Sequence, residues 1–180
     1  MDEGGRDLLR VDRLGPAGGG CLNVVAALLV MAGFLLPWAS CAGNSANGLE
    51  LTTAGLRGDL PNQAAALVGL APLLALGLLG VGLALLPLAA REKMRAGLFS
   101  LRAVGSALLG ALALAGLALA GAFFLGVRQA QRLNDDLLGL GGLVAIENGF
   151  WVTALGFVLA LAGAALAFVT SFVKVGLRKK

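Results

Sequence analysis

Four long stretches of the chain contain no Asp, Glu, Lys or Arg, and this pattern limits the possible folds more than any other feature. The stretches lie between Arg13 and Glu50, between Asp59 and Arg91, between Arg102 and Arg128, and between Glu147 and Lys174. A helix needs about 20 apolar residues to cross the hydrocarbon core of a bilayer, and an unpaired charge inside that core is costly. The pattern therefore predicts four transmembrane helices, at about 22–39, 62–89, 103–127 and 150–173.

The composition excludes the other fold classes. Hydrophobic residues make up 58% of the chain and charged residues 13%, and the mean hydropathy is +0.89. A soluble domain carries about 25% charged residues, so this chain has too few polar groups to cover a soluble surface. No alternation of apolar and polar residues runs through the four stretches, which argues against a membrane barrel. The expected fold is an all-α membrane protein, a bundle of four antiparallel transmembrane helices.

The Lys and Arg residues predict how the bundle is oriented. Eleven of them lie in the N-terminal segment, between the second and third helices, and in the tail, whereas three lie on the other side: Arg57, Arg128 and Arg132. Because cytoplasmic loops carry the excess of Lys and Arg, both termini are expected in the cytoplasm. The protein is then a multi-pass protein of a plasma membrane, and its net charge of +4 reflects orientation and contact with anionic lipid. Nucleic-acid binding is not expected, because the basic residues are split among three segments.

This orientation divides the chain into three parts. We expect a cytoplasmic N-terminal segment at 1–20, a four-span transmembrane domain at 21–175 and a basic cytoplasmic tail at 176–180. The external segments are then 40–61 and 128–149.

The two external segments carry signals of local structure. The string CAGNSANG in the first favours a turn or a hairpin tip, and the alternation over Leu49–Thr53 indicates a strand. In the second, Gln129–Asn134 extends the third helix, and Leu137–Ile146 is an apolar run too short to span a bilayer. This run is expected to pack on the first external segment, with an interfacial or re-entrant segment as the alternatives.

A cap made of both segments follows from that packing. Burial of Leu140 within the apolar run is expected to stabilise the cap more than pairing of external charges such as Glu50 with arginines.

Features within the helices predict how they pack. Pro72 is expected to kink the second helix near mid-span. Stripes of small residues, which let helix backbones approach closely in lipid, occur on the third helix at Ala103, Ala107, Ala111 and Ala115, again at Ala118, Ala122 and Gly126, and on the fourth at Gly156, Ala160 and Ala164. The spacing leaves open which faces pair and whether a partner uses one.

The two cysteines and two tryptophans mark the expected membrane boundaries. Cys21 and Cys41 flank the first helix at a separation of about 30 Å, too far for a disulfide. Cys21 is either a plain thiol or an acylation site. Trp38 ends the first helix and Trp151 opens the fourth, so both indoles are expected at the outer interface with the N–H in water. A quinone or pigment contact there is the alternative.

The chain lacks the residues on which most chemistry depends. It has no His and no Tyr, no CxxC motif and no phosphate-binding loop. We therefore expect no catalytic residue, no cofactor and no metal; paired Asp135 and Asp136 are the nearest approach to a cation site. The expected helices also carry no charge, whereas a coupled transporter normally has one within the membrane.

Three short sequence motifs of the chain resemble those of a group of membrane proteins. Gly33–Trp38 (GFLLPW), Asn47–Leu51 (NGLEL) and Gly149–Trp151 (GFW) resemble the pattern of small bacterial four-helix membrane proteins of uncharacterised role. In those, Pro-Trp closes the first helix, Gly-Leu follows in the loop, and Gly-aromatic-Trp opens the fourth helix. More distantly, the layout is similar to the claudin and peripheral-myelin-protein group, with Trp38 and Gly48-Leu49 at matching positions, and this implies an adhesion or scaffold role.

These observations favour a non-catalytic integral membrane protein. We expect an accessory or structural subunit that packs on protein partners in a larger complex, or on copies of itself. The alternatives are a small oligomeric channel or transporter, with Pro72 as hinge, and a claudin-like adhesion protein. The candidate anchor and interface residues are Trp38, Trp151, Phe150, Glu50 and Leu140.

Overall fold

The computed structural model describes residues 3–58, 64–90, 96–138 and 144–177. Its long helices are α1 (Glu3–Leu35), α4 (Leu70–Ala90), α5 (Ala96–Leu138) and α6 (Asn148–Leu177). Four segments are long and apolar enough to cross a membrane: Gly18–Leu35, Ala65–Pro87, Leu101–Arg132 and Asn148–Thr170. The second of them includes the short helix α3 (Ala64–Leu67). The prediction of four long apolar helices is therefore confirmed.

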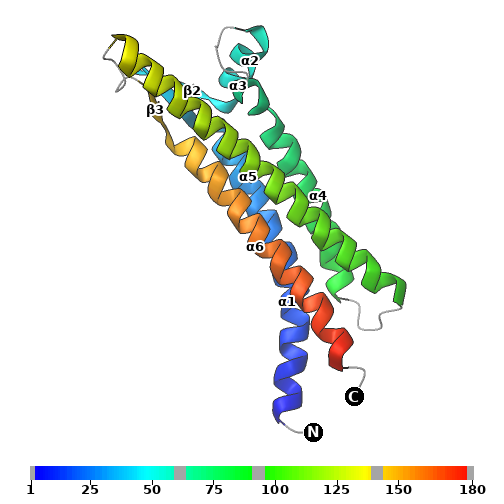
Figure 1. Cartoon of the computed structure of the whole chain (residues 1–180). Coiled ribbons are helices and arrows are strands. Elements are labelled where there is room, and N and C mark those ends of the chain that lie inside the picture. The colour runs from blue at the N-terminus through cyan, green and yellow to red at the C-terminus, as the bar shows by residue number, and fades with distance from the viewer. Residues whose placement is uncertain (1–2, 59–63, 91–95, 139–143, 178–180) are drawn as a thin grey trace.

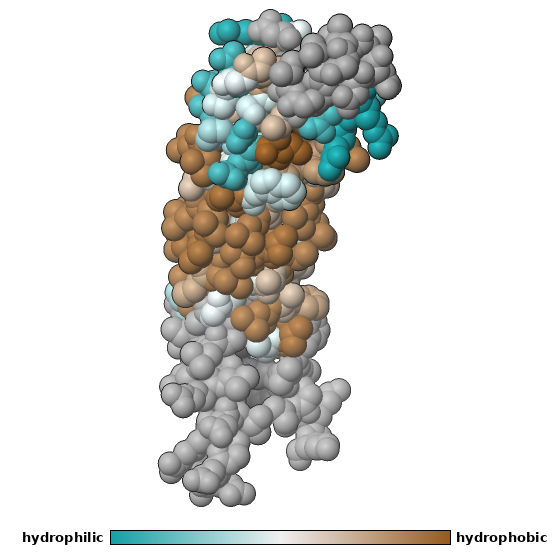
Figure 2. Space-filling model, turned by 90° about the vertical axis from the view of Figure 1, so that its left-hand side faces the viewer, coloured by the Kyte–Doolittle hydropathy of each residue, from teal (hydrophilic) through white to brown (hydrophobic). Residues whose placement is uncertain are grey.

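The four long helices form one bundle in which neighbours run antiparallel (Figure 1). α1 packs against α4 and α6, and α5 packs against the same two helices from the other side. The start of α1 and the end of α6 lie at one end of the bundle, and the strands lie at the other. Apolar side chains form a belt around the middle of the face shown in Figure 2, with polar side chains gathered at the strand end.

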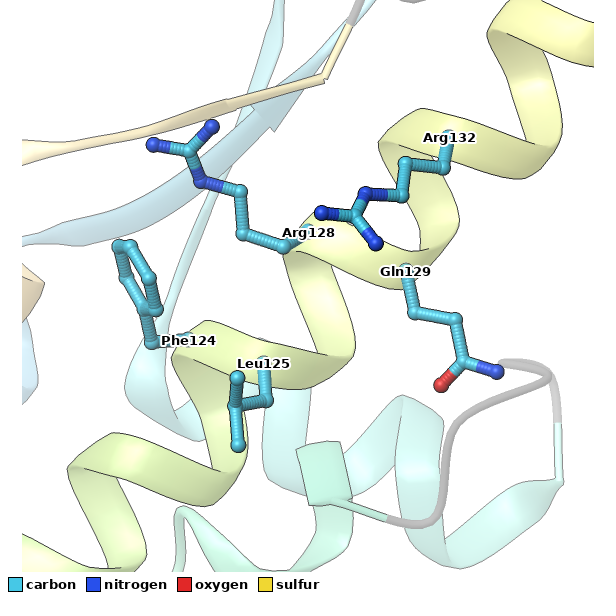
Figure 3. Close-up of a pocket in the computed structure, with 5 residues that line it drawn as sticks. All are labelled: Phe124, Leu125, Arg128, Gln129 and Arg132. Carbon is cyan, nitrogen blue, oxygen red and sulfur yellow. The ribbon is translucent and has the colours of Figure 1, made fainter.

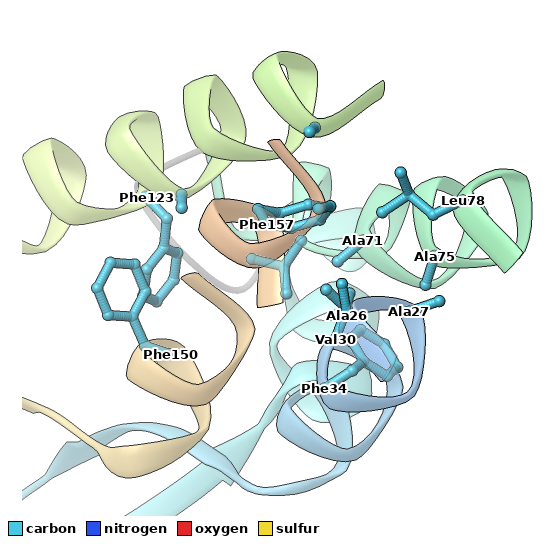
Figure 4. Packing of buried hydrophobic residues seen from close by; sticks show 14 of the residues in the cluster. Ala26, Ala27, Val30, Phe34, Ala71, Ala75, Leu78, Phe123, Phe150 and Phe157 are labelled. Atoms are coloured by element: carbon cyan, nitrogen blue, oxygen red, sulfur yellow. The ribbon is translucent and has the colours of Figure 1, made fainter. Parts of the chain in front are cut away.

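The interior of the bundle is filled by hydrocarbon side chains. Small residues of α1 and α4, among them Ala26 and Ala75, let these two helices approach, and larger ones such as Leu78 and Phe157 fill the remaining space (Figure 4). All four of these side chains are at most 1% exposed. Close packing of this kind makes the core sensitive to changes of a single methylene group.

α1 and α6 meet through small residues spaced seven apart in both helices. A Cβ added to the α6 glycines would lie 2.8–3.0 Å from a carbonyl oxygen of α1, and the facing pairs are Gly149 with Gly33, Gly156 with Ala26, and Gly163 with Gly19. A side chain at the α6 positions would therefore push the backbones apart. A strict repeat of seven is the spacing that keeps one face in contact along a left-handed pair of helices.

A small three-stranded antiparallel sheet closes the other end of the bundle. Strand β1 (Pro37–Cys41) lies between β2 (Asn44–Asn47) and β3 (Val144–Ile146). Ser40 pairs with Ser45 on one side and with Ala145 on the other. Ala42 and Gly43 form the hairpin turn with positive φ, at 50° and 86°, so the predicted hairpin tip is confirmed. The sheet adds a β element to a fold that is otherwise helical.

Two local predictions about the first external segment were wrong. The first helix ends at Leu35 instead of residue 39, because Pro37 has no N–H to donate and its ring clashes with the preceding turn. Leu49–Thr53 is not a strand but part of helix α2 (Gly48–Arg57). Asn47 and Glu50 form a capping box at the start of α2. This helix-initiating motif outweighs the five-residue alternation that had predicted a strand.

The other helix boundaries also differ from those predicted. Pro72 does not kink the second helix at mid-span; it lies in the first turn of α4, where its missing N–H costs no helical bond. The chain turns just before it, at Val68 and Gly69, between α3 and α4. α5 continues to Leu138, so the predicted extension of the third helix through Gln129–Asn134 is confirmed.

Candidate functional site

Trp38 is a core residue, so its predicted place at a wet interface was wrong. Its side chain is 0% exposed, and its indole Nε1 donates a hydrogen bond to the Gly33 carbonyl oxygen at 2.9 Å. In an uninterrupted helix that carbonyl would accept from the backbone N–H of residue 37, which is a proline. The Gly33 carbonyl accepts from the indole and also from the Leu36 N–H at 3.2 Å. The buried indole thus has an acceptor at the helix end that Pro37 creates.

An aromatic cluster connects Trp38 to the outer surface of the bundle. The rings of Phe123 and Phe150 lie 5.3 Å and 5.9 Å from Trp38, both edge-on. Phe150 is 4% exposed, so this predicted interface residue faces inward. Trp151 lies 5.0 Å from Phe150 and is 54% exposed. Of the two tryptophans, only Trp151 has the exposure that a boundary position requires.

The two segments that were predicted to be external meet in the three-stranded sheet, and together they form the cap of the bundle. β3 pairs with β1, the Glu147 N–H donates to the Trp38 carbonyl at 2.9 Å, and the Ser40 hydroxyl donates to the Glu147 carboxylate at 2.6 Å. The Glu50 carboxylate accepts from the Asn47 N–H at 2.9 Å. Within the described residues, the Glu147 carboxylate thus accepts from the β1 residue Ser40, and the Glu50 carboxylate accepts from the N-cap residue Asn47. Neither carboxylate pairs with an arginine there, contrary to the prediction.

Some predicted cap residues cannot be placed. Leu140 and Asp59 lie outside the described residues. The predicted burial of Leu140 therefore stays a prediction.

Helix α2 presents an apolar face to the outside of the cap. Its inner face packs on α3, where a Cβ at Gly55 would lie 2.5 Å from the Ala66 nitrogen, and Leu51 is 8% exposed. Leu49 and Leu56, seven residues apart, are 56% and 74% exposed. They lie on α2 at the strand end of the bundle (Figure 1), beside the charged Arg57, and form an exposed apolar pair there.

A cavity of about 560 Å³ lies along α5 near the sheet, lined by Phe124, Leu125, Arg128, Gln129 and Arg132 (Figure 3). The Arg128 guanidinium lies over the Phe124 ring at 5.3 Å, which is within the range of a cation–π contact. The Arg132 side chain runs back along the helix toward Arg128. The cavity therefore combines two cations and an amide with an apolar floor.

A second hollow is a groove of about 380 Å³ on the outside of the bundle, where α4 and α5 meet. Its lining is entirely Leu and Ala: Leu67, Leu70, Leu73 and Leu74 from α3 and α4, and Ala115, Ala118, Leu119 and Ala122 from α5. The small α5 residues are exposed, whereas the predicted small stripe of α6 is buried, with Gly156 close to α1 and Ala164 close to Gly110 of α5. The structure thus assigns the two stripes different faces, which the spacing alone left open.

Four of the buried side chains among the described residues are polar: Asn23, Arg102, Ser106 and Thr153. Asn23 is 0% exposed; its Nδ2 donates to the Gly19 carbonyl at 2.8 Å, and its Oδ1 has no hydrogen-bond partner among the described residues. It lies where α1 meets Gly82 of α4 and Gly163 of α6. Thr153 is also 0% exposed. An amide and a hydroxyl do not titrate near neutral pH, so Asn23 and Thr153 do not form an acid–base pair.

No group of three or more His, Cys, Asp or Glu residues that could hold a metal ion occurs within the described residues. Cys21 and Cys41 are both free and exposed, so the prediction that they do not pair is confirmed.

The comparisons with known proteins add no assignment. No protein-family model matches the chain, and no curated protein or solved structure is similar to it. The resemblance to small four-helix membrane proteins therefore stays a prediction.

Sequence reasoning missed both hollows. The cationic cavity could have been found from Phe124, Arg128 and Arg132, which recur at intervals of four on one helix face. The groove could not, because its α4 wall depends on how two helices meet.

Proposed function

We propose that the chain is a multi-pass membrane protein without a catalytic role, which serves as an accessory or structural subunit in a larger membrane complex. Its termini are in the cytoplasm and its cap is outside. The support lies in where the features of the molecule are. The interior is filled by apolar side chains, while the exposed Leu49 and Leu56 and the two hollows all lie on the outer surface.

The observation that carries the proposal is the apolar pair on α2. Leu49 and Leu56 are more than half exposed on a helix whose other exposed residues include Glu50, Thr53 and Arg57. The capping box at Asn47 and the left-handed Gly58 that ends α2 fix both ends of this helix. A rigid helix that shows two leucines at the strand end of the bundle is suited to contact a partner protein, because covering them removes apolar surface from water.

Purification in mild detergent followed by mass spectrometry tests this function. The tagged wild-type protein is expected to copurify with a defined membrane protein, and L49S/L56S is expected to lose it while keeping its own yield and helicity. R57S is the matched control, because Arg57 is exposed on the same helix but adds no apolar surface. A solitary monomer, or equal recovery of the partner by all three proteins, would contradict the proposal.

A flux measurement distinguishes the proposed accessory role from the rival function, a small channel or transporter. A bundle whose centre is occupied by Phe157, Leu78 and Leu109, all 0% exposed, is not expected to conduct. Purified protein in liposomes should therefore show no ion flux above protein-free vesicles. Reproducible conductance that scales with the amount of protein would favour the rival.

A further inference from the structure

The apolar groove and the cationic cavity are parts of one continuous face of α5. The face is formed by residues that alternate in spacing between three and four: Ala115, Ala118, Ala122, Leu125, Gln129 and Arg132. Residues at these intervals are neighbours on a helix surface. The first three line the groove between α4 and α5, and the last three line the cavity near the sheet. A molecule that lies along this face would pass from hydrocarbon to cations.

The length of the apolar part equals one leaflet of a bilayer. From Ala115 to Leu125 the helix rises about 15 Å at 1.5 Å per residue, and half of the hydrocarbon core is also about 15 Å. Arg128 follows one turn later, as the first charge after the apolar stretch that began beyond Arg102. The change from groove to cavity therefore falls at the level where lipid headgroups begin.

Aromatic residues mark the same level independently. Trp151 on α6 is 54% exposed, and its ring lies 6.5 Å from that of Phe124, over which the Arg128 guanidinium lies. Exposed tryptophans are typical of the headgroup region. Asp135 and Asp136 follow Arg132 by three and four positions on α5, and their backbone lies about 10–12 Å farther along the helix than that of Arg128.

We propose that this face binds one anionic phospholipid. Its phosphate accepts hydrogen bonds from Arg128 and Arg132, and an acyl chain lies in the groove of leucines and alanines. Charge complementarity selects the headgroup. An apolar groove that extends about 10 Å along α5, from Ala115 to Ala122, selects a molecule with an acyl chain over a free anion. The inference rests on the membrane placement proposed above, but it does not require a protein partner.

Titration of purified, delipidated protein followed by native mass spectrometry tests the site. The probes are dioleoylphosphatidylglycerol, dioleoylphosphatidylcholine, a dihexanoyl phosphatidylglycerol, inorganic phosphate and a glutamate-rich peptide. The dioleoyl anionic lipid is expected to bind most tightly. Each arginine near an anionic headgroup is worth about a fivefold gain in affinity, so R128Q/R132Q should weaken this lipid about thirtyfold. The affinity for phosphatidylcholine should hardly change.

A second variant tests the groove separately. A118F places an aromatic ring in the groove and is expected to weaken dioleoylphosphatidylglycerol while leaving the short-chain lipid unchanged. A111F is the matched control, since Ala111 is exposed on α5 but does not line the groove. All the substituted positions are exposed, and unchanged helicity and elution volume would show that the variants fold.

Several results would overturn the proposal. They are equal affinity for the two dioleoyl lipids, competition by inorganic phosphate at the concentration of the lipid, tighter binding of the acidic peptide, and an R128Q/R132Q variant that binds as well as wild type. Because the measurement contains no other protein, loss of the partner predicted above would leave its outcome unchanged. Failure of this proposal and failure of the accessory function are therefore distinguishable.

Discussion

At the scale of single residues, one proline determines how the first helix ends and what lies beneath the cap. Pro37 ends α1 because it can neither donate a hydrogen bond nor fit in the next turn. The Gly33 carbonyl accepts the indole N–H of Trp38 at 2.9 Å and the Leu36 N–H at 3.2 Å. Pro37 thus ends the helix, and Trp38 places its buried donor on a carbonyl of the last turn.

Substitution of Trp38 by Phe should destabilise the protein more than the same change at Trp151. W38F removes a buried donor and leaves space in a packed cluster, which together cost about 2–3 kcal/mol of unfolding free energy. W151F changes a side chain that is 54% exposed and should cost less than about 0.5 kcal/mol. Reversible unfolding in mixed detergent micelles measures both. Similar losses for the two variants would show that the indole of Trp38 has no special role.

Glu50 has a structural role that its exposed position conceals. Its carboxylate accepts the Asn47 N–H, and Asn47 accepts the Glu50 N–H at 3.0 Å. E50K removes half of the capping box and places a cation at a helix N-terminus, at a cost of about 1 kcal/mol. Amides of α2 should then exchange hydrogen about fivefold faster. T53K also introduces a lysine into α2 but leaves the capping box intact, so its exchange should stay near wild type. Equal exchange rates in E50K and T53K would show that the capping box has no special role.

At the scale of secondary-structure elements, α1 and α6 form the tightest pair because both carry small residues at every seventh position. Each carbonyl oxygen of the α1 series lies within 3.0 Å of the place that a Cβ would take on an α6 glycine, so the two backbones approach as closely as glycine allows. In lipid, where burial of apolar surface drives no association, such close packing is a main source of helix–helix stability.

Replacement of Gly156 by Val should separate these two helices. A Cβ there would lie 2.7 Å from the Val30 Cγ2 atom, so α6 must shift, at a cost of about 1–3 kcal/mol. Gly121 on α5 is the matched control, because a Cβ at that position meets nothing within 4 Å among the described residues. The midpoint of thermal unfolding in detergent should fall for G156V and stay near wild type for G121V. Equal midpoints would contradict the packing described for α1 and α6.

The sequence predicted these elements unevenly, for physical reasons. Charge-free stretches report helix number well, because lipid tolerates few charges and the signal extends over many residues. Ends of elements depend on single contacts such as the capping box at Asn47, which a short alternation over Leu49–Thr53 conceals. The burial of Trp38 depends on a sheet formed by segments more than 100 residues apart along the chain, and no local pattern contains that information. The α4–α5 groove is missed for the same reason.

At the scale of the whole molecule, the two ends of the bundle differ in structure. One end is closed by a sheet and a capped helix, while the other holds the start of α1 and the end of α6. The outer surface between them carries the groove and the cationic cavity. This polarity is what an accessory protein of a membrane requires, because a partner or a lipid can recognise one side of the bilayer only if the protein's two ends are distinct.

The two native cysteines allow that polarity to be measured directly. Cys41 ends β1 in the cap, and Cys21 lies on α1 toward the opposite end; both are exposed and free. In intact cells, a membrane-impermeant maleimide should label C21S, which keeps Cys41, and should leave C41S, which keeps Cys21, unlabelled. Both variants should be labelled after solubilisation in detergent. Labelling of Cys21 from outside, or protection of Cys41 in intact cells together with its labelling in detergent, would contradict a membrane protein with an external cap.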